Sequence, residues 1–199
     1  MESPKGEFMT FAMQFEPDSG YGDGSAEPRG ARSRQIGQVL LCLGLIDREA
    51  LVRGLRRQCD EGGRLGTCLL DLGLIDEPSL LAALGAARGV AVADGDMLAG
   101  ASGEVTERLP RRAARLLRAL PFGRGPNGIR VALEDPTSLA TLDQLRGILG
   151  GPVEPHLALE IRLAQALDHH YGVEAPGRFV RILERRARRS EVAPSAAAC

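Results

Sequence analysis

The pentapeptide Leu43-Gly44-Leu45-Ile46-Asp47 recurs without change as Leu72-Gly73-Leu74-Ile75-Asp76, 29 residues further along the chain. The same offset maps Ile36-Gly37 onto Leu65-Gly66. Internal similarity at a fixed period is the sequence signature of a tandem structural unit. We therefore expect two copies of one motif over residues 34–88.

Each copy is typical of two short helices joined by a tight turn, because its aliphatic residues recur at helical spacing. Gly44 and Gly73 stand where a helix C-terminus favours a left-handed residue. Asp47 and Asp76 follow at positions suited to capping the next helix through a side-chain oxygen. Four helices are predicted in this stretch.

Gly37 and Gly66 lie near the start of predicted helices, where glycine costs about 1 kcal/mol relative to alanine. We therefore expect another group to approach the backbone closely at both positions. One candidate is a neighbouring helix of the same bundle. The other is a planar or phosphorylated ligand resting on the glycine and the helix N-terminal amides.

The second copy opens with Arg64-Leu65-Gly66 and continues through Leu69 to Gly73, and the first copy closes with Gln58. This pattern resembles the MshEN-type domain, the N-terminal region of the ATPases that drive type II secretion and type IV pilus assembly. In some members the tandem motifs bind cyclic-di-GMP. The resemblance implies a candidate cyclic-di-GMP site made of Arg34, Gln35, Ile36, Gly37, Leu40, Gln58, Arg64, Leu65, Gly66 and Leu69.

Two positions depart from the family pattern: Gln35 stands where the motif has arginine, and Ala87 where it closes with glutamine. An arginine fork suits the O6/N7 edge of guanine and carries charge, which Gln35 cannot supply. Arg34 is adjacent, but it points about 100° away if both residues are helical. Each lost polar contact removes roughly 1 to 3 kcal/mol from the interaction.

A second lobe is predicted over residues 104–172, after a Gly- and Ala-rich linker over 89–103 with a short strand near Val90 to Ala93. The resemblance extends over this lobe. Its expected elements are helices at 111–117, 137–149 and 159–171, with Thr137 as a cap, and strands at 119–122, 129–133 and 153–157. The fold class is therefore α+β, with a helical N-terminal lobe followed by a small α/β lobe that holds a three-stranded sheet.

Arginine makes up all but one of the 25 basic residues. The stretch from Arg108 to Arg130 contains no acidic residue, and the spacing of the arginines in its predicted helix places them on adjoining faces of that helix. A solvated helix face and an anion or partner patch are both consistent with this run. The patch would consist of Arg108, Arg111, Arg112, Arg115 and Arg118.

Both ends fall outside the two lobes. Residues 1–33 have the composition of a disordered tail, although Phe8, Phe11 and Phe15 could share a helical face that docks on a partner. Residues 173–199 predict a basic amphipathic helix and a tail. That helix could lie on an acidic membrane surface, bind nucleic acid, pack on a partner or remain solvated.

Several functional classes lack their signatures. The single lysine, Lys5, is not in a P-loop, and no catalytic constellation is evident. The four cysteines show no metal-ligand spacing, and the three that lie within or beside apolar helix faces, Cys42, Cys59 and Cys68, are expected to be small core residues in a reducing cytoplasm. His156, His169 and His170 suggest surface positions and no metal site, and no membrane span is present.

The leading hypothesis is therefore a non-enzymatic, cytoplasmic adaptor or regulatory protein without cofactor, which docks onto a protein such as a component of a secretion or pilus machine. The alternative is a cyclic-di-GMP receptor. Nucleic acid is the least favoured partner.

Overall fold

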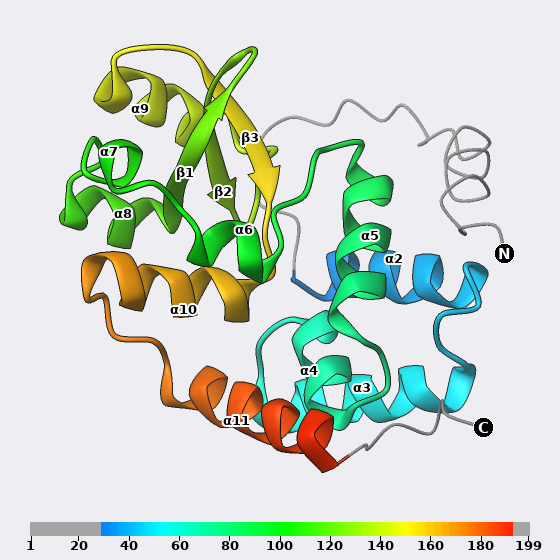
Figure 1. Ribbon diagram of the computed structural model, residues 1–199. Helices are drawn as coiled ribbons and strands as arrows, with labels where there is room; N and C mark the ends of the chain where they lie inside the picture. Colours follow the sequence, from blue (N-terminus) through cyan, green and yellow to red (C-terminus); the bar gives the residue numbers. More distant parts are fainter. Residues whose placement is uncertain (1–28, 193–199) are drawn as a thin grey trace, which may run out of the picture.

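The computed structural model describes residues 29–192 (Figure 1). Its first part is the predicted set of four helices, although the first of them begins five residues before Arg34. Asp47 Oδ1 accepts from the amide of Ala50 at 2.7 Å, and Asp76 Oδ1 accepts from Ser79 at 2.8 Å, so both predicted caps are confirmed. The helices are α2 (Arg29–Cys42), α3 (Arg48–Glu61), α4 (Leu65–Leu72) and α5 (Glu77–Arg88).

The close approach expected at the two repeat glycines is made by leucines of the same bundle. A Cβ built on Gly37 would lie 2.8 Å from Leu51 Cδ1, and one on Gly66 would lie 3.1 Å from Leu80 Cδ2. Leu51 and Leu80 are themselves equivalent in the two copies. The two glycines therefore serve helix packing, as the first of the two candidates proposed.

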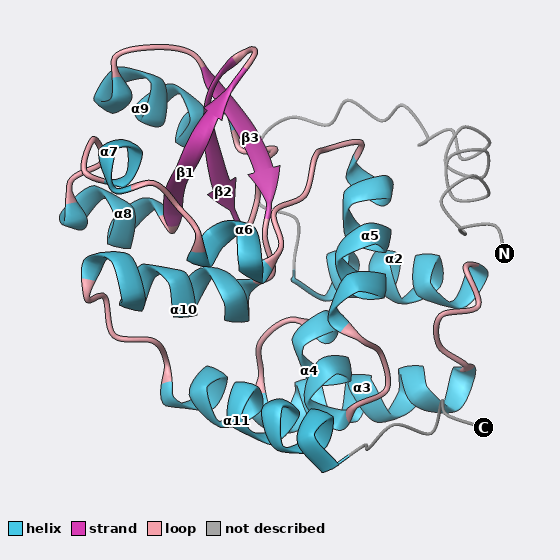
Figure 2. Ribbon diagram, viewed as in Figure 1, coloured by secondary structure: helices cyan, strands magenta, loops and turns pink. Residues whose placement is uncertain are grey.

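The second lobe is built around one small sheet (Figure 2). Strands β1 and β2 form an antiparallel hairpin, and β2 pairs in parallel with β3 after a crossover through α9. The predicted α+β class, helices first and then a three-stranded sheet, is confirmed. The remaining elements are α6 (Gly95–Ala99), α7 (Gly103–Thr106), α8 (Arg111–Leu117), β1 (Ala119–Gly125), β2 (Gly128–Leu133), α9 (Leu139–Leu149), β3 (Val153–Leu157), α10 (Glu160–Tyr171) and α11 (Gly177–Val192).

Local predictions were wrong in two places. Thr137 does not cap α9, because Ser138 occupies the N-cap and its hydroxyl accepts from the amide of Thr141. The side chain of Thr137 instead bonds to Asp135, in a turn before the helix. The strand expected near Val90 to Ala93 is a single parallel bridge between Val92 and Leu157.

Two buried clusters follow the two lobes, except that Leu159 and Ile161 at the start of α10 belong to the cluster of the helical lobe. The helical lobe packs around residues such as Leu40, Leu69 and Leu80, and the α/β lobe around the sheet with α8, α9 and α10. Helix α11 follows the α/β lobe in sequence, yet Phe179 and Leu183 pack against the core of the helical lobe. Figure 1 shows α11 running back beneath α10 toward α4 and α3. The chain therefore closes on its own first lobe.

Candidate functional site

The motif residues gather where α2, α3 and α4 meet. A Cβ on Gly37 would lie 3.3 Å from Leu65 Cδ2, which places the glycine of the first copy against the leucine of the second. Gln58 donates from Nε2 to the carbonyl of Gly63 at 2.8 Å, one residue before Arg64. The backbone of Arg34 and Gln35 lies in α2, while their side chains are outside the described part of the structure.

The aliphatic members of the candidate site are mainly structural. Leu40, Leu65 and Leu69 are almost completely buried in the core of the helical lobe, and Ile36 packs against that core while partly exposed. These leucines support the surface residues through core packing and are not themselves accessible to a ligand. Gln58 and Arg64 are the polar members that the described surface presents.

Arg64 is the N-cap residue of α4, and its guanidinium reaches the second lobe. Nη2 lies 2.9 Å from Glu134 Oε2, Nη1 donates to the carbonyl of Glu134 at 3.1 Å, and Nε lies 3.3 Å from Glu160 Oε2. Thr67 donates its hydroxyl to the other oxygen of Glu160. The motif arginine therefore joins the tandem repeat to the end of β2 and the start of α10.

Glu134 holds a second cation on its other oxygen. Arg118 Nη2 lies 2.7 Å from Glu134 Oε1, so two arginines share one largely buried carboxylate. With Glu160 beside them, the two positive charges are matched by two negative ones. An anionic ligand at Arg64 would therefore have to compete with carboxylates already in place.

The predicted basic patch is divided among different partners. Arg108 Nη2 donates to the carbonyl of Leu149 at 2.8 Å, and Arg111 Nη2 donates to the carbonyl of Gly172 at 2.6 Å. These carbonyls lie at the C-termini of α9 and α10, where a cation is favourable. With Arg118 on Glu134, Arg112 and Arg115 are the exposed arginines of α8 whose guanidinium groups have no hydrogen-bond or ion-pair partner among residues 29–192.

Some expectations about single residues are corrected. Cys42 and Cys59 are exposed, and only Cys68 of the three cysteines described is a core residue. Burial raises the pKa of the Cys68 thiol, and the nearby Arg178 partly opposes that shift. His156 is buried against Phe122, with ring centroids 5.1 Å apart, so it is not a surface histidine.

Sequence reasoning missed the role of α11. Its apolar face packs on the helical lobe, and Arg186 Nε reaches Glu77 Oε1 at 3.1 Å. Arg178 Nη1 donates to the carbonyls of Glu61 and Gly62, at 3.1 and 2.8 Å. The solvated-helix hypothesis is therefore wrong for the described part of α11. An acid among the leucines of α4, Asp71, was the signal that a basic partner was needed.

Asp71 has a side chain that is only 1% exposed, and two arginines neutralise it. Arg57 Nη2 lies 2.7 Å from Oδ2, and Arg185 Nη2 lies 2.6 Å from Oδ1. The hydrogen bond to Asp71 raises the pKa of the Arg57 guanidinium above its ordinary value. The carboxylate thus connects α3, α4 and α11.

The described residues contain neither a metal-binding cluster nor a membrane-spanning helix. Over residues 29–192, no group of three His, Cys, Asp or Glu side chains is placed to hold a metal ion. Within the same range, no helix has the length and apolar character needed to span a membrane.

Comparison with known proteins gives the family. The MshEN domain model matches residues 98–177. The type IV pilus assembly ATPase PilB of Myxococcus xanthus (strain DK1622) is 26% identical over 147 residues, which are 72% of this chain and 25% of that protein. The chain thus spans about a quarter of the length of this curated relative.

Two solved structures are similar to this chain, and the first of them supports the family match. A structure of MshE with cdg, the dinucleotide cyclic-di-GMP, is 31% identical with a TM-score of 0.52, over 68% of this chain and 98% of that one. The N-terminal domain of XpsE is 22% identical with a TM-score of 0.48, over 74% of this chain and 99% of the other. From the MshE match and the family model together, this chain belongs to the MshEN domain family, the N-terminal domain type of secretion and pilus assembly ATPases.

Proposed function

We propose that this chain is a non-enzymatic regulatory adaptor that docks onto a protein of a secretion or pilus machine. The observation that carries the proposal is the polar bridge from Arg64 to Glu134 and Glu160. Because the bridge holds the repeat and the α/β lobe together, a partner would bind a surface whose two halves are already in place before association. Preorganisation lowers the ordering cost of association.

The test is affinity capture with the full chain as bait, from cells that express a secretion or pilus machine. We expect an ATPase or another component of that machine to be enriched. The double variant Glu134→Gln, Glu160→Gln keeps the side-chain sizes and removes both charges of the bridge, and should recover several-fold less partner. Glu104→Gln, at an exposed ion pair with Arg124, is the matched control. Absence of any machine component with the wild-type bait rejects the proposal.

A second candidate function is binding of cyclic-di-GMP at the tandem motif. It is supported by the 31% identity to MshE, whose structure was solved with that ligand. It is also supported by the close approach of Gly37 to Leu65 and by the hydrogen bond from Gln58 to Gly63, the residue before Arg64. The Arg64 side chain is 46% exposed, so its guanidinium can turn outward without unfolding the motif.

Isothermal titration calorimetry with cyclic-di-GMP distinguishes a cyclic-di-GMP receptor from an adaptor that only docks onto a protein. Wild-type chain should release heat at micromolar ligand, Arg64→Ala should lose it, and Gln35→Arg should bind more tightly by supplying the motif arginine of the first copy. No heat from either wild type or Gln35→Arg at high micromolar ligand rejects the receptor function. Docking would be unaffected by that result.

A further inference from the structure

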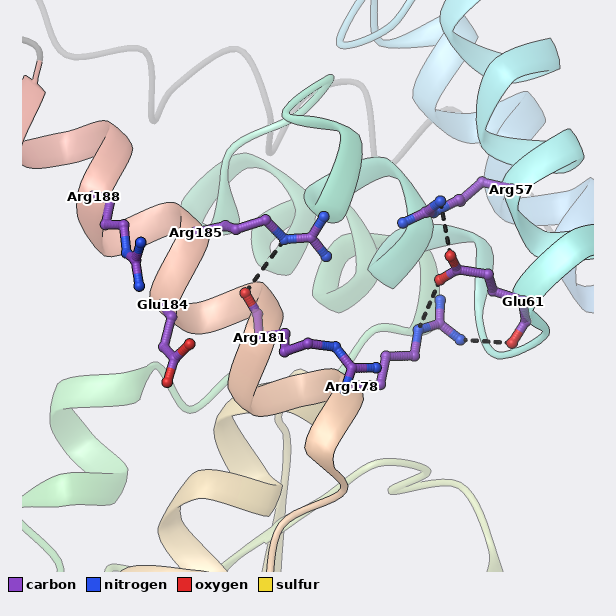
Figure 3. Close-up of a pocket in the computed structure, with 7 residues that line it drawn as sticks. All are labelled: Arg57, Glu61, Arg178, Arg181, Glu184, Arg185 and Arg188. Carbon is purple, nitrogen blue, oxygen red and sulfur yellow. Dashed lines mark hydrogen bonds and ion pairs between the residues drawn. The ribbon is translucent and has the colours of Figure 1, made fainter.

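Four arginines form one stripe along α11: Arg178, Arg181, Arg185 and Arg188, at spacings of three and four residues. That spacing places them on a single helical face. The stripe borders a pocket of about 420 Å³ between α11 and the end of α3, where Arg57 and Glu61 complete the wall together with Glu184 (Figure 3). A volume of this size suits a small ligand.

The arginines of the pocket differ in how they are held. Arg57 and Arg185 are both fixed by the buried carboxylate of Asp71, and Arg178 is fixed by the carbonyls of the α3–α4 turn. Figure 3 shows Arg57 extending from α3 toward α11, while Arg185 and Arg181 extend from α11 toward α3. Guanidinium groups from two helices therefore face a common space, and Asp71 holds those of Arg57 and Arg185 in place.

Arg181 and Arg188 have no recorded hydrogen-bond or ion-pair partner for their guanidinium groups among the described residues, and both are exposed. They lie beside three further arginines, and the lining contains two glutamates. With the buried carboxylate of Asp71 behind Arg57 and Arg185 also counted, five positive charges face three negative ones, so the site carries a net charge of two positive. Like charges at this spacing repel unless a counter-ion is present. Nothing in the fold requires Arg181 and Arg188 to be cationic.

The lining indicates which anion would be recognised. Planar guanidinium forks bind phosphate oxygens through paired hydrogen bonds, and several of them together can neutralise more than one phosphate group. The wall contains no aromatic side chain on which a base could stack. We propose that the α3–α11 pocket binds a small ligand with two or more linked phosphate groups, recognised through its phosphates.

The pocket takes Arg57 and Glu61 from the first copy of the repeat but shares no lining residue with the candidate cyclic-di-GMP site, so it can be tested independently of the proposed function. Isothermal titration calorimetry with inorganic pyrophosphate, at about 0.15 M salt to screen non-specific attraction, measures binding to the full chain. We expect saturable binding with one ligand per chain. Orthophosphate should bind at least about tenfold more weakly, because it offers fewer oxygens to the separated guanidinium groups. Citrate, a polyanion without phosphate, should also bind more weakly.

The variants Arg181→Gln and Arg188→Gln remove charges that make no hydrogen bond or ion pair with the residues that the structure describes, so they should remain folded by circular dichroism. Each is expected to weaken pyrophosphate binding about tenfold. Glu184→Gln should strengthen it by removing a like charge. Arg112→Gln and Arg115→Gln on α8 are matched charge-loss controls, and Arg64→Ala tests independence from the tandem motif; all three should bind as wild type.

Equal losses in the α8 controls and the pocket variants would mean that net charge alone attracts the anion, and the site would be rejected. Absence of saturable heat with wild type rejects it as well. Citrate binding as tight as pyrophosphate binding would overturn the assignment to phosphates.

Discussion

Arg64 Nη2 lies 2.9 Å from Glu134 Oε2, and these residues belong to different lobes, 70 positions apart in sequence. The contact gives the arginine that opens the second repeat a partner in the other lobe. The same carboxylate also binds Arg118. Glu134 is therefore one of the points at which the repeat and the α/β lobe are held together.

Replacing Glu134 by Gln should lower the free energy of unfolding by about 1 kcal/mol, since the pairs are partly exposed and such pairs contribute little each. Urea denaturation measures the change. Glu104→Gln removes an exposed pair with Arg124 and should change stability by less than about 0.5 kcal/mol. If cyclic-di-GMP binds at Arg64, Glu134→Gln should also tighten that binding, because the guanidinium loses a competing carboxylate. Equal stability of both variants would contradict the role given to Glu134.

The buried carboxylate of Asp71 predicts an asymmetry between removing the acid and removing its partners. Asp71→Asn leaves Arg57 and Arg185 side chains that are 29% and 48% exposed and can be hydrated, so the expected cost is about 1 kcal/mol. The double variant Arg57→Gln, Arg185→Gln leaves a carboxylate with almost no access to water, and should cost about 3 kcal/mol or more.

Urea denaturation of the two Asp71-site variants at pH 7 gives both values. A triple variant that combines Asp71→Asn with Arg57→Gln and Arg185→Gln should regain most of the stability that the double variant loses, because no buried charge is then left without a partner. A double variant as stable as Asp71→Asn would mean that water already reaches the carboxylate.

Much of the fold follows from local chemistry in the sequence. The caps at Asp47 and Asp76 and the left-handed turns at Gly44 and Gly73, with φ of 65° and 70°, are set by residues within one turn of the chain. The choice of Ser138 over its neighbour Thr137 as a cap was not predictable, because both are good caps and tertiary packing selects between them.

The position of α11 is a tertiary property that its own sequence does not specify. A narrow apolar stripe flanked by arginines fits many surfaces, and the helical lobe is the one it covers. That contact also explains why the two repeats diverge. Asp71 and Glu77, which bind arginines of α11, correspond to Cys42 and Arg48 of the first copy. The two copies are therefore identical in their turns and differ at the positions where α11 binds the second copy.

Gly54 should not tolerate a methyl group, although it lies inside helix α3. A Cβ there would be 2.6 Å from Leu69 Cδ2 and 3.0 Å from Leu65 Cδ1, and both leucines are buried. Overpacking costs about 1 to 3 kcal/mol and exceeds the gain of about 1 kcal/mol in helix propensity. Gly54→Ala should therefore lower the melting temperature.

Gly147 in α9 is the matched control, because a Cβ built there meets nothing within 4 Å. Gly147→Ala should raise the melting temperature through helix propensity alone. Changes of the same sign in the two variants would show that packing at Gly54 is looser than the distances indicate.

Because of Tyr171, the α/β lobe is expected to lose stability at alkaline pH. Burial raises the pKa of its phenol to about 12 from the ordinary value of 10, and the hydroxyl donates to the carbonyl of Thr106 at 2.7 Å. Because the folded-state pKa is the higher one, the protonated phenol stabilises the fold fully below pH 10. That contribution is lost as the pH rises through 12.

Tyr171→Phe should therefore be less stable than wild type by about 1 kcal/mol at pH 8, owing to the lost hydrogen bond. The difference should shrink or reverse by about 1 to 2 kcal/mol between pH 10 and 12, since phenylalanine does not titrate and a partly exposed phenol keeps some solvation. Denaturation by urea at intervals across this range measures the difference, in which the titration of all other groups cancels. A difference that stays constant from pH 8 to 12 would place the Tyr171 hydroxyl in contact with water, and the packing of α10 against the α7 turn would then be less tight than the 2.7 Å hydrogen bond implies.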